Sequence, residues 1–248
     1  AAQLEKEFCT YIGTDYALAV SSGTGALEVA YAAAGIGPGD EVIVPAWSWI
    51  SCYTAIMRVG ARPVFCEIDD TLNIDPKEIA RLVTPRTKAV SVIHYQGVAA
   101  EMDVIQREAH KLGLFVVEDC AQSLGATYRG RHIGTWSDVA IYSFQYNKIA
   151  TCGEGGMVVT RDQRIYERAV RYHDIGNYRP YHADIVAPRE PAFAGGQYRL
   201  SEVSSAMALA QFRKVDAMRD HCRALQARIV AKVTGLAGIE LRRIPDPD

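Results

Sequence analysis

Two side chains of this sequence could together support pyridoxal phosphate chemistry. Asp119 ends a hydrophobic run that starts at Leu114, and Lys148 lies 29 residues further on, ahead of a glycine cluster at 153–156. A lysine amine can hold the aldehyde of that cofactor as a Schiff base, and a carboxylate can keep the pyridine nitrogen protonated so that the ring accepts electrons. Taken singly, Lys148 would be a solvated surface group, and Asp119 a helix cap or a structural ion pair. The pairing therefore predicts a pyridoxal 5'-phosphate site.

The segment Ser22-Gly23-Thr24-Gly25 joins a predicted strand to a predicted helix. Such a turn directs backbone N–H groups outward at the positive end of the helix dipole, which suits a phosphate. A simpler alternative is that Ser22 or Thr24 only caps the helix. Trp49, which follows another apolar run, could stack on a flat heterocycle or could pack in the core. A nicotinamide dinucleotide site is disfavoured, because Gly-x-Gly-x-x-Gly is absent here.

Strands and helices of moderate length alternate along the chain, which predicts a layered α/β domain with a mostly parallel sheet. The predicted strands cover residues 16–20, 41–44, 63–67, 87–93, 114–118, 139–144 and 157–160. The predicted helices cover residues 4–11, 26–34, 51–59, 76–82, 102–112 and 163–172. Ligands of such sheets bind at the carboxyl ends of the strands. Five candidate groups fall at or just beyond such ends: Thr24, Trp49, His94, Asp119 and Ser143. Of these, His94 is a candidate substrate contact. Glu118 should point to the face opposite Asp119, because strand side chains alternate.

The last third of the chain has a different pattern. Residues 174–199 have no clear period, so this long loop is either functional or an ordinary surface excursion. Its candidate substrate contacts are Tyr178, Arg179, Tyr181 and His182. A helical pattern then runs over 201–233, with a break expected near Met218, and 236–243 reads as the opening of a strand. We therefore expect a large cofactor domain at 1–215, followed at 216–248 by a connecting helix and the start of a truncated small domain.

The composition, 49% apolar and 23% charged with a net charge of −2, is that of an ordinary globular protein. The balanced charge predicts neither a nucleic-acid nor a membrane-surface partner, and no apolar run approaches the roughly 18 residues of a membrane span. The beginning of the chain has no secretory signature, so a cytoplasmic protein is expected. Its six cysteines lack zinc spacing, which predicts reduced thiols and no metal site. A catalytic thiol at Cys120 or Cys152 is disfavoured, because no histidine is placed by sequence to activate either.

Six motifs follow one another along the chain. They are Ser22-Gly23-Thr24 with Ala26-Leu27, the run 37–45, Asn73-Ile74-Asp75-Pro76, the run 118–126, the segment 143–148 and Gly153-Glu154-Gly155-Gly156. In this order they resemble the DegT/DnrJ/EryC1/StrS family of fold-type I pyridoxal-phosphate-dependent aminotransferases, through nearly the whole chain. The resemblance implies the large domain of that fold, a mostly parallel seven-stranded sheet with helices on both faces, with the small C-terminal domain largely missing. It also implies a homodimer whose active site is shared between subunits.

The resemblance implies roles for individual residues. Lys148 is similar to the Schiff-base lysine, which later shuttles a proton, and Asp119 to the partner of the pyridine nitrogen. Gln122 is similar to the residue that hydrogen-bonds the ring hydroxyl, and Trp49 to the aromatic that stacks on the ring. The implied phosphate ligands include Thr24, Gly25 and Ser143 within the turn and strand end described above.

Three departures from the family pattern stand out. Gln197 occupies the place of an Asn that usually reaches the partner subunit's phosphate, so its role is open. Ser48 stands where Thr is common. The third departure is the small C-terminal domain, most of which lies outside this sequence.

The resemblance implies an aminotransferase that uses glutamate or glutamine as donor and a nucleotide-linked keto-sugar or a keto-cyclitol as acceptor. Gln145 and the following Gly-Glu-Gly-Gly are more similar to the cyclitol and aminobenzoate members, which suggests antibiotic-type secondary metabolism. Two alternatives stay open. One is a lyase or dehydratase on the same fold, but the dehydratase branch carries His in place of the lysine. The other is a non-catalytic binding protein, which the intact Asp119, Gln122, Ser143 and Lys148 disfavour.

Overall fold

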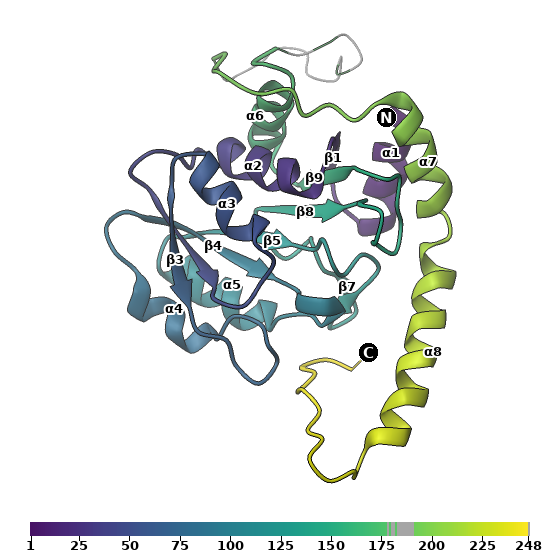
Figure 1. The fold of residues 1–248 in the computed structure, drawn as a ribbon. Coiled ribbons are helices and arrows are strands. Elements are labelled where there is room, and N and C mark those ends of the chain that lie inside the picture. The colour runs from purple at the N-terminus through teal and green to yellow at the C-terminus, as the bar shows by residue number, and fades with distance from the viewer. Residues whose placement is uncertain (178, 180–181, 183–190, 248) are drawn as a thin grey trace.

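A seven-stranded sheet forms the centre of the computed structural model, which describes residues 1–177, 179, 182 and 191–247 (Figure 1). The strand order is β1-β9-β8-β5-β4-β2-β3. The strands are β1 (Tyr16–Val20), β2 (Glu41–Pro45), β3 (Arg62–Cys66), β4 (Thr87–Ile93), β5 (Phe115–Asp119), β8 (Val139–Ser143) and β9 (Gly156–Thr160). Strands β8, β5, β4, β2 and β3 pair in parallel, and β9 runs antiparallel to β1 and β8. The predicted seven-stranded, mostly parallel sheet is confirmed.

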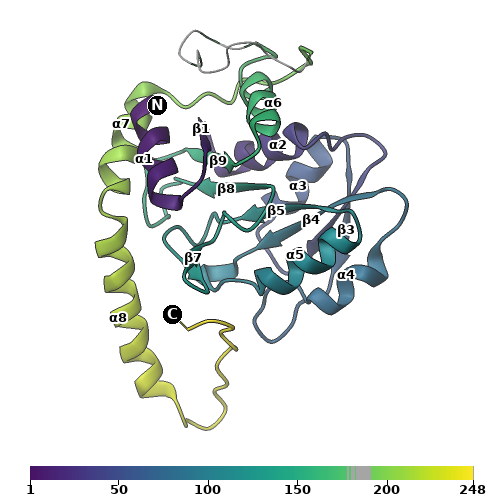
Figure 2. The same cartoon turned by 180° about the vertical axis from the view of Figure 1, so that it is seen from behind.

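Helices cover both faces of this sheet, as predicted (Figures 1 and 2). The helices are α1 (Ala2–Ile12), α2 (Gly23–Ala33), α3 (Ser51–Arg58), α4 (Pro76–Leu82), α5 (Met102–Lys111), α6 (Gln163–His173), α7 (Glu202–Phe212) and α8 (Val215–Val233). Apolar side chains of α2, α3 and α6 pack in one cluster with Val117 and Ile141 of the sheet. Those of α1, α4, α5 and α7 pack in a second cluster with Val116 and Ala140. Neighbouring strand residues thus enter opposite clusters, as the two-residue period of a strand requires.

Local sequence signals account for several turns and caps. Outside the large sheet lie the hairpin strands β6 (Thr127–Tyr128) and β7 (Arg131–His132) and the 3-10 helix η1 (Tyr95–Gly97). Asp75 caps α4 by accepting a main-chain N–H at 2.9 Å, and Pro76 takes the first helical position. The tight turn between β6 and β7 has positive φ angles of 50° at Arg129 and 70° at Gly130. A two-residue hairpin turn that follows the strand twist needs positive φ at both positions.

Two predictions for the C-terminal part are wrong. The helical pattern breaks at Arg213 and Lys214, between α7 and α8, and not near Met218, whose N–H continues α8 by donating to the Lys214 carbonyl. Lys214 closes a tighter turn onto Gln211 at 2.9 Å, which separates the two helices. Residues 236–243 form no strand, because among the described residues no neighbouring strand pairs with them. Side-chain hydrogen bonds from Arg242 and Arg243 to distant loops hold this segment instead.

Helix α8 extends away from the sheet, and the chain then curves back beside it (Figure 2). Val215 is its buried residue, and the remainder of the helix is exposed or half-buried. The division expected at residue 215 coincides with the start of this helix, and it stays a prediction. No helix in the described part of the chain has both the length and the apolar character needed to cross a membrane.

Candidate active site

Asp119 is the last residue of β5, and its side chain points toward α3. The residue is 4% exposed. Its Oδ1 accepts the main-chain N–H of Ala121 at 3.0 Å, and its Oδ2 accepts the Cys52 thiol of α3 at 3.2 Å. Burial raises the pKa of Asp119, although these hydrogen bonds and the charge of Lys148 oppose the shift. A buried carboxylate of this kind is stabilised in its ionised form by a cation placed next to it.

Lys148 lies in the loop after β8, where its main-chain N–H closes a turn onto the carbonyl of Gln145 at 3.0 Å. The residue is half-buried and not a solvated surface lysine. Burial lowers the pKa of the Lys148 amine below its ordinary value, and the negative charge of Asp119 opposes that shift. Each group thus acts electrostatically on the other. The fold therefore brings the two predicted catalytic residues into one site.

Helix α2 begins directly beside the end of β8. Ser22 is its N-cap, because the Ser22 Oγ accepts the N–H of Gly25 at 2.9 Å. A Cβ on Gly23 would lie 2.8 Å from the Cβ of Ser143, so this close approach requires glycine. The first turn of α2, which includes Thr24, and the hydroxyl of Ser143 therefore lie next to one another. A helix N-terminus beside a serine hydroxyl is well suited to hold a phosphate.

Trp49 and Gln122 lie in loops at the carboxyl ends of two parallel strands, β2 and β5, which are separated by β4. Trp49 follows β2 and is 61% exposed, so its indole does not pack in the core. Its carbonyl accepts the N–H of Cys52 at 3.0 Å in the turn that opens α3. Gln122 follows β5, and its Oε1 accepts the N–H of Gln96 at 2.8 Å. Gln96 has a φ of 50°, and strained backbone of this kind is often found at functional sites.

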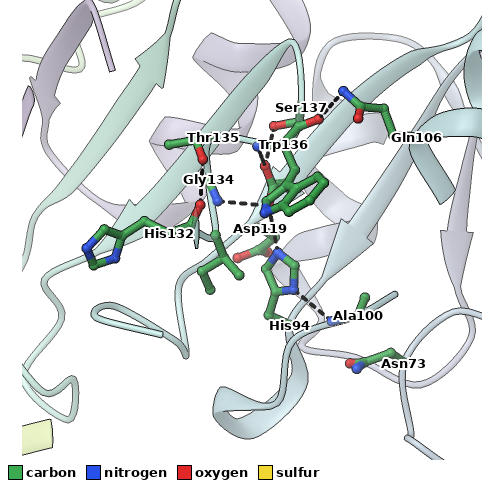
Figure 3. A network of polar contacts seen from close by, with 12 residues as sticks. Asn73, His94, Ala100, Gln106, Asp119, His132, Gly134, Thr135, Trp136 and Ser137 are labelled. Atoms are coloured by element: carbon green, nitrogen blue, oxygen red, sulfur yellow. Dashed lines mark hydrogen bonds and ion pairs between the residues drawn. The ribbon is translucent and has the colours of Figure 1, made fainter. Parts of the chain in front are cut away.

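Glu118 and His94 form a polar network on the opposite face of the sheet (Figure 3). The Glu118 carboxylate accepts hydrogen bonds from His94 Nε2 at 3.0 Å, Gly134 N at 2.8 Å, Trp136 N at 3.0 Å and Ser137 Oγ at 2.7 Å. Burial alone would raise the pKa of Glu118, but these hydrogen bonds, led by that from His94, hold it below its ordinary value. Since Asp119 makes separate contacts on the other face, the two acids do not act as a pair, as predicted.

His94 was predicted as a substrate contact, and its placement argues against that role. Its ring is 0% exposed, and its Nδ1 accepts the N–H of Ala100 at 3.1 Å, so the proton resides on Nε2. Both ring nitrogens are thus used inside the protein. Cys120 lies within 4.8 Å of the His94 and Glu118 ligand atoms, but hydrogen-bond donors already surround the carboxylate that a metal would need.

The loop predicted to contact the substrate is described only in part. Tyr178 and Tyr181 lie outside the described residues. Arg179 is exposed and donates to the buried Asp174 at 2.6 Å. His182 is 5% exposed and lies 3.5 Å from the hydroxyl of a tyrosine on α6. Arg179 and His182 line a cavity that does not include Lys148, and their substrate role stays a prediction.

Gln197 is exposed and pairs with Asp174 in an isolated β-bridge. It lines a cavity together with Arg179 and Arg199, and Lys148 is not among the residues that line this cavity. The next residue, Tyr198, packs against the first turn of α2, because a Cβ on Gly25 would lie 2.9 Å from its ring. The segment therefore contacts the candidate phosphate-binding turn, while Gln197 lines a cavity that does not include Lys148.

Sequence reasoning missed one residue of the site. Cys52 is 1% exposed, donates to Asp119, and lies 3.1 Å from the Oγ of Ser48. The spacing of Cys52 four residues after Ser48 predicts that these two side chains meet at the start of a helix. Nothing in the sequence indicates the contact with Asp119, which lies 67 residues further along the chain.

The arrangement fits the predicted cofactor. A carboxylate has about four acceptor positions, and the described hydrogen bonds to Asp119 come from Ala121 and Cys52. Acceptor capacity is therefore left for a ring N–H. The Lys148 amine, the exposed indole of Trp49 and the glycine-lined start of α2 provide groups for an aldehyde, a ring face and a phosphate.

Comparison with known proteins identifies close relatives of this site and fold. The sequence model of the DegT/DnrJ/EryC1/StrS aminotransferase family matches residues 1–247. Among solved structures, DesV of S. venezuelae is 38% identical with a TM-score of 0.91, over 99% of this chain and 65% of DesV. 3-Amino-5-hydroxybenzoic acid synthase is 38% identical with a TM-score of 0.83, over 93% of this chain and 60% of that one.

A third similar structure, GDP-4-keto-6-deoxy-D-mannose-3-dehydratase of E. coli, was solved with bound hydrated pyridoxal phosphate. It is 26% identical with a TM-score of 0.89, over 99% of this chain and 68% of that one. The present chain thus spans less than two thirds of the length of the first two relatives. The likenesses confirm the predicted fold, the large domain of a fold-type I enzyme.

Proposed function

Because the chain belongs to the DegT/DnrJ/EryC1/StrS aminotransferase family, we propose that it binds pyridoxal 5'-phosphate through Lys148 and transfers amino groups. One observation carries this proposal. The half-buried amine of Lys148 and the buried carboxylate of Asp119 influence each other's pKa at one edge of the sheet, beside the start of α2. That is the constellation expected for a covalently held, ring-protonated pyridine cofactor.

Pyridoxal phosphate, when bound, supplies an electron sink. Lys148 holds the cofactor aldehyde and, when released by an incoming amine, takes a proton from the substrate carbon and returns it. This requires a neutral amine, which the lowered pKa of Lys148 favours. Asp119 would hold the proton on the pyridine nitrogen, and the start of α2 with Ser143 would bind the phosphate. Trp49 would cover one face of the ring, and Gln122 would hydrogen-bond the ring hydroxyl.

For the substrates, we propose glutamate or glutamine as the donor and a nucleotide-linked keto-sugar or a keto-cyclitol as the acceptor. One of the similar structures is named for a GDP-linked keto-sugar, and another is named for 3-amino-5-hydroxybenzoic acid, which is an aminobenzoate. Gln145 and the Gly-Glu-Gly-Gly run favour the cyclitol and aminobenzoate side of this choice. Such products belong to antibiotic-type secondary metabolism, which is the proposed setting.

We further propose that the protein works as a homodimer with a shared site, in the cytoplasm. The exposed Gln197 supports this proposal, because the cavity that it lines does not include the Lys148 of its own chain. In a dimer its amide would be free to reach the phosphate in the partner's site, as the Asn it replaces does in the family. An amide that is one methylene longer can make the same hydrogen bond from a backbone set slightly further back.

Replacement of Lys148 by Ala tests the proposed function. In the wild-type protein, borohydride should fix the cofactor to the peptide that contains Lys148, as mass spectrometry detects. The variant should lose this adduct, and its transamination rate should fall at least ~1,000-fold, because both the attachment point and the base are removed. Lys77→Ala, at an exposed lysine, is the matched control and should behave as wild type.

Two results would contradict the proposal. The first is unchanged turnover or an unchanged adduct in Lys148→Ala. The second is release of ammonia, or loss of a sugar hydroxyl, in place of amino transfer by the wild-type protein, since that result would indicate a lyase or a dehydratase. A wild-type protein that gives no cofactor absorption at all would indicate a non-catalytic protein.

A further inference from the structure

We propose that Cys52 is a positioning residue for Asp119, whose thiol hydrogen bond sets how tightly the carboxylate holds a proton. The inference rests on the proposed function, because the proton of interest is the one shared with the cofactor ring. Its geometric basis is the 3.2 Å contact from Cys52 Sγ to Asp119 Oδ2, within a site where both residues are almost fully buried.

The direction of this hydrogen bond follows from its neighbours. Asp119 in its ionised form can only accept, so the Cys52 thiol must donate to it. A thiol has one proton, so Ser48 must in turn donate its hydroxyl proton to the sulfur across 3.1 Å. Burial and the charge of Asp119 raise the pKa of the Cys52 thiol well above its ordinary value, so the thiol keeps its proton. The result is a chain of donors, from Ser48 through Cys52 to Asp119, in which each bond polarises the next.

The comparison of Asp119 with its neighbour Glu118 shows why this one donor matters. Both acids are buried, but Glu118 receives four hydrogen bonds and its pKa is lowered, whereas the pKa of Asp119 is raised. Among the described residues, the donors to Asp119 are the Ala121 N–H and the Cys52 thiol. A carboxylate with so few donors is sensitive to each of them. The thiol, a weak donor, leaves the carboxylate basic enough to hold a ring proton.

The other titratable groups that face Asp119 do not provide the same control. Lys148 lowers its pKa through its charge, His94 uses both ring nitrogens on Glu118 and Ala100, and Tyr31 of α2 and Cys120 are themselves influenced by the charge of Asp119. None of these four has a described hydrogen bond to the carboxylate. Cys52 also links Asp119 to Trp49, because its N–H donates to the Trp49 carbonyl at 3.0 Å. Cys52 thereby fixes the position of Trp49, which would cover the ring face, relative to Asp119, which would bind the ring nitrogen.

Two substitutions of Cys52 and one control test this role. Cys52→Ala removes the donor, and Cys52→Ser replaces it with a stronger one. Cys120→Ala removes another fully buried thiol next to Asp119 in the chain, one that has no described bond to its carboxylate. The first measurement is nitrogen-15 NMR of the bound cofactor labelled at its ring nitrogen, followed as a function of pH. The second is carbon-13 NMR of the Asp119 carboxylate in the cofactor-free protein.

We expect the proton affinity of the cofactor ring nitrogen and that of the Asp119 carboxylate to rise in the order Ser, Cys, Ala at position 52. The step from wild type to Cys52→Ala should be about tenfold, the effect of one hydrogen bond to a charged group. Cys120→Ala should leave both titrations at their wild-type midpoints. A merely structural role for Cys52 would change stability without this ordered shift.

The inference is refuted if Cys52→Ala titrates as wild type does, or if Cys120→Ala shifts the midpoints equally. The serine variant keeps the test decisive should the alanine variant fold poorly. Failure of the proposed function is recognised separately. In that case the labelled cofactor gives no bound signal, while the carboxylate titration of the cofactor-free protein still decides whether Cys52 controls Asp119.

Discussion

The substitution Glu118→Gln should destabilise the protein strongly, although it only exchanges one carboxylate oxygen for an NH₂ group of similar size and removes the charge. The Glu118 side chain is fully buried, and its two oxygens accept four hydrogen bonds. The donors come from His94, after β4, and from the segment that leads into β8. The carboxylate therefore connects the strand that carries Asp119 to segments on both sides of it.

The magnitude follows from counting the donors. The amide of glutamine keeps one carbonyl oxygen, which can accept about two hydrogen bonds, and it turns an NH₂ group toward the other donors. A buried donor without an acceptor costs about 1–3 kcal/mol, so two of them should lower the free energy of unfolding by about 4 kcal/mol. For a chain of this size that corresponds to a fall in Tm of about 10 °C.

Urea unfolding of wild type and variant, followed by circular dichroism, measures this difference. Glu67→Gln is the matched control, because Glu67 is exposed, and it should change the stability by less than about 0.5 kcal/mol. Because the pKa of Glu118 is lowered in the folded state, its contribution is present above the ordinary value of 4.5 and is lost as the pH falls through the lowered value. The difference in the free energy of unfolding between wild type and Glu118→Gln should therefore become smaller at acid pH.

Two outcomes would refute this reasoning. One is a loss below about 1 kcal/mol near neutral pH, which would mean that water or a rearranged loop satisfies the donors. The other is a difference in the free energy of unfolding between wild type and variant that does not change at acid pH. The raised pKa of Asp119 affects the stability in the opposite direction, because its ionisation destabilises the folded state as the pH rises. Asp119 is present in both proteins, so this contribution cancels in the difference between them.

Two further predictions concern the cofactor site directly. Gly23→Ala should weaken cofactor binding about tenfold or more, because its Cβ would lie 2.8 Å from the Cβ of Ser143, an overlap that costs ~1–3 kcal/mol. Fluorescence titration measures the affinity for the cofactor. Gly37→Ala is the control, because its Cβ would make only an ordinary contact at 3.7 Å. Equal affinities of Gly23→Ala and wild type would contradict the prediction. The rate of cofactor capture should rise with pH and level off below the pH at which an ordinary lysine deprotonates, because burial lowers the pKa of Lys148. Asp119→Ala should lower the pH midpoint of cofactor capture further, because the charge of Asp119 opposes the lowering of the Lys148 pKa. Stopped-flow measurement of the capture rate gives this midpoint, and a midpoint at the ordinary lysine value in the wild-type protein would contradict a lowered pKa for Lys148.

Much of the fold was predictable because strands buried on both faces form continuous apolar runs. The boundaries expected for the strands at 16–20 and 87–93 are those of β1 and β4, and the helix expected at 76–82 is α4. The alternation of side chains along a strand also predicts that Glu118 and Asp119 lie on opposite faces of the sheet. These features depend on residues that are neighbours in the sequence, so they can be predicted from the sequence alone.

Predictions failed where the outcome depends on a distant partner. A strand at 236–243 needs another strand to pair with, and a periodic pattern does not show whether one is present. His94 follows a strand end like the other candidates, but its environment is set by Glu118 and Ala100, so its ring turns into the protein. The helix break at Lys214 rests on one tighter hydrogen bond that residue types do not specify.

By itself the sequence determined the kinds of groups available: an amine, an acid, a glycine-rich turn and an aromatic, each at a strand end. It also determined the layered fold, because hydrophobic periodicity is a local property. Only the tertiary structure decided the environment of each group. Burial lowers the pKa of Lys148 and raises that of Asp119, the charge of each group opposes the shift of the other, and packing of α3 on the sheet presents the Cys52 thiol to that carboxylate. Desolvation and long-range hydrogen bonds arise from chain segments that meet only after folding.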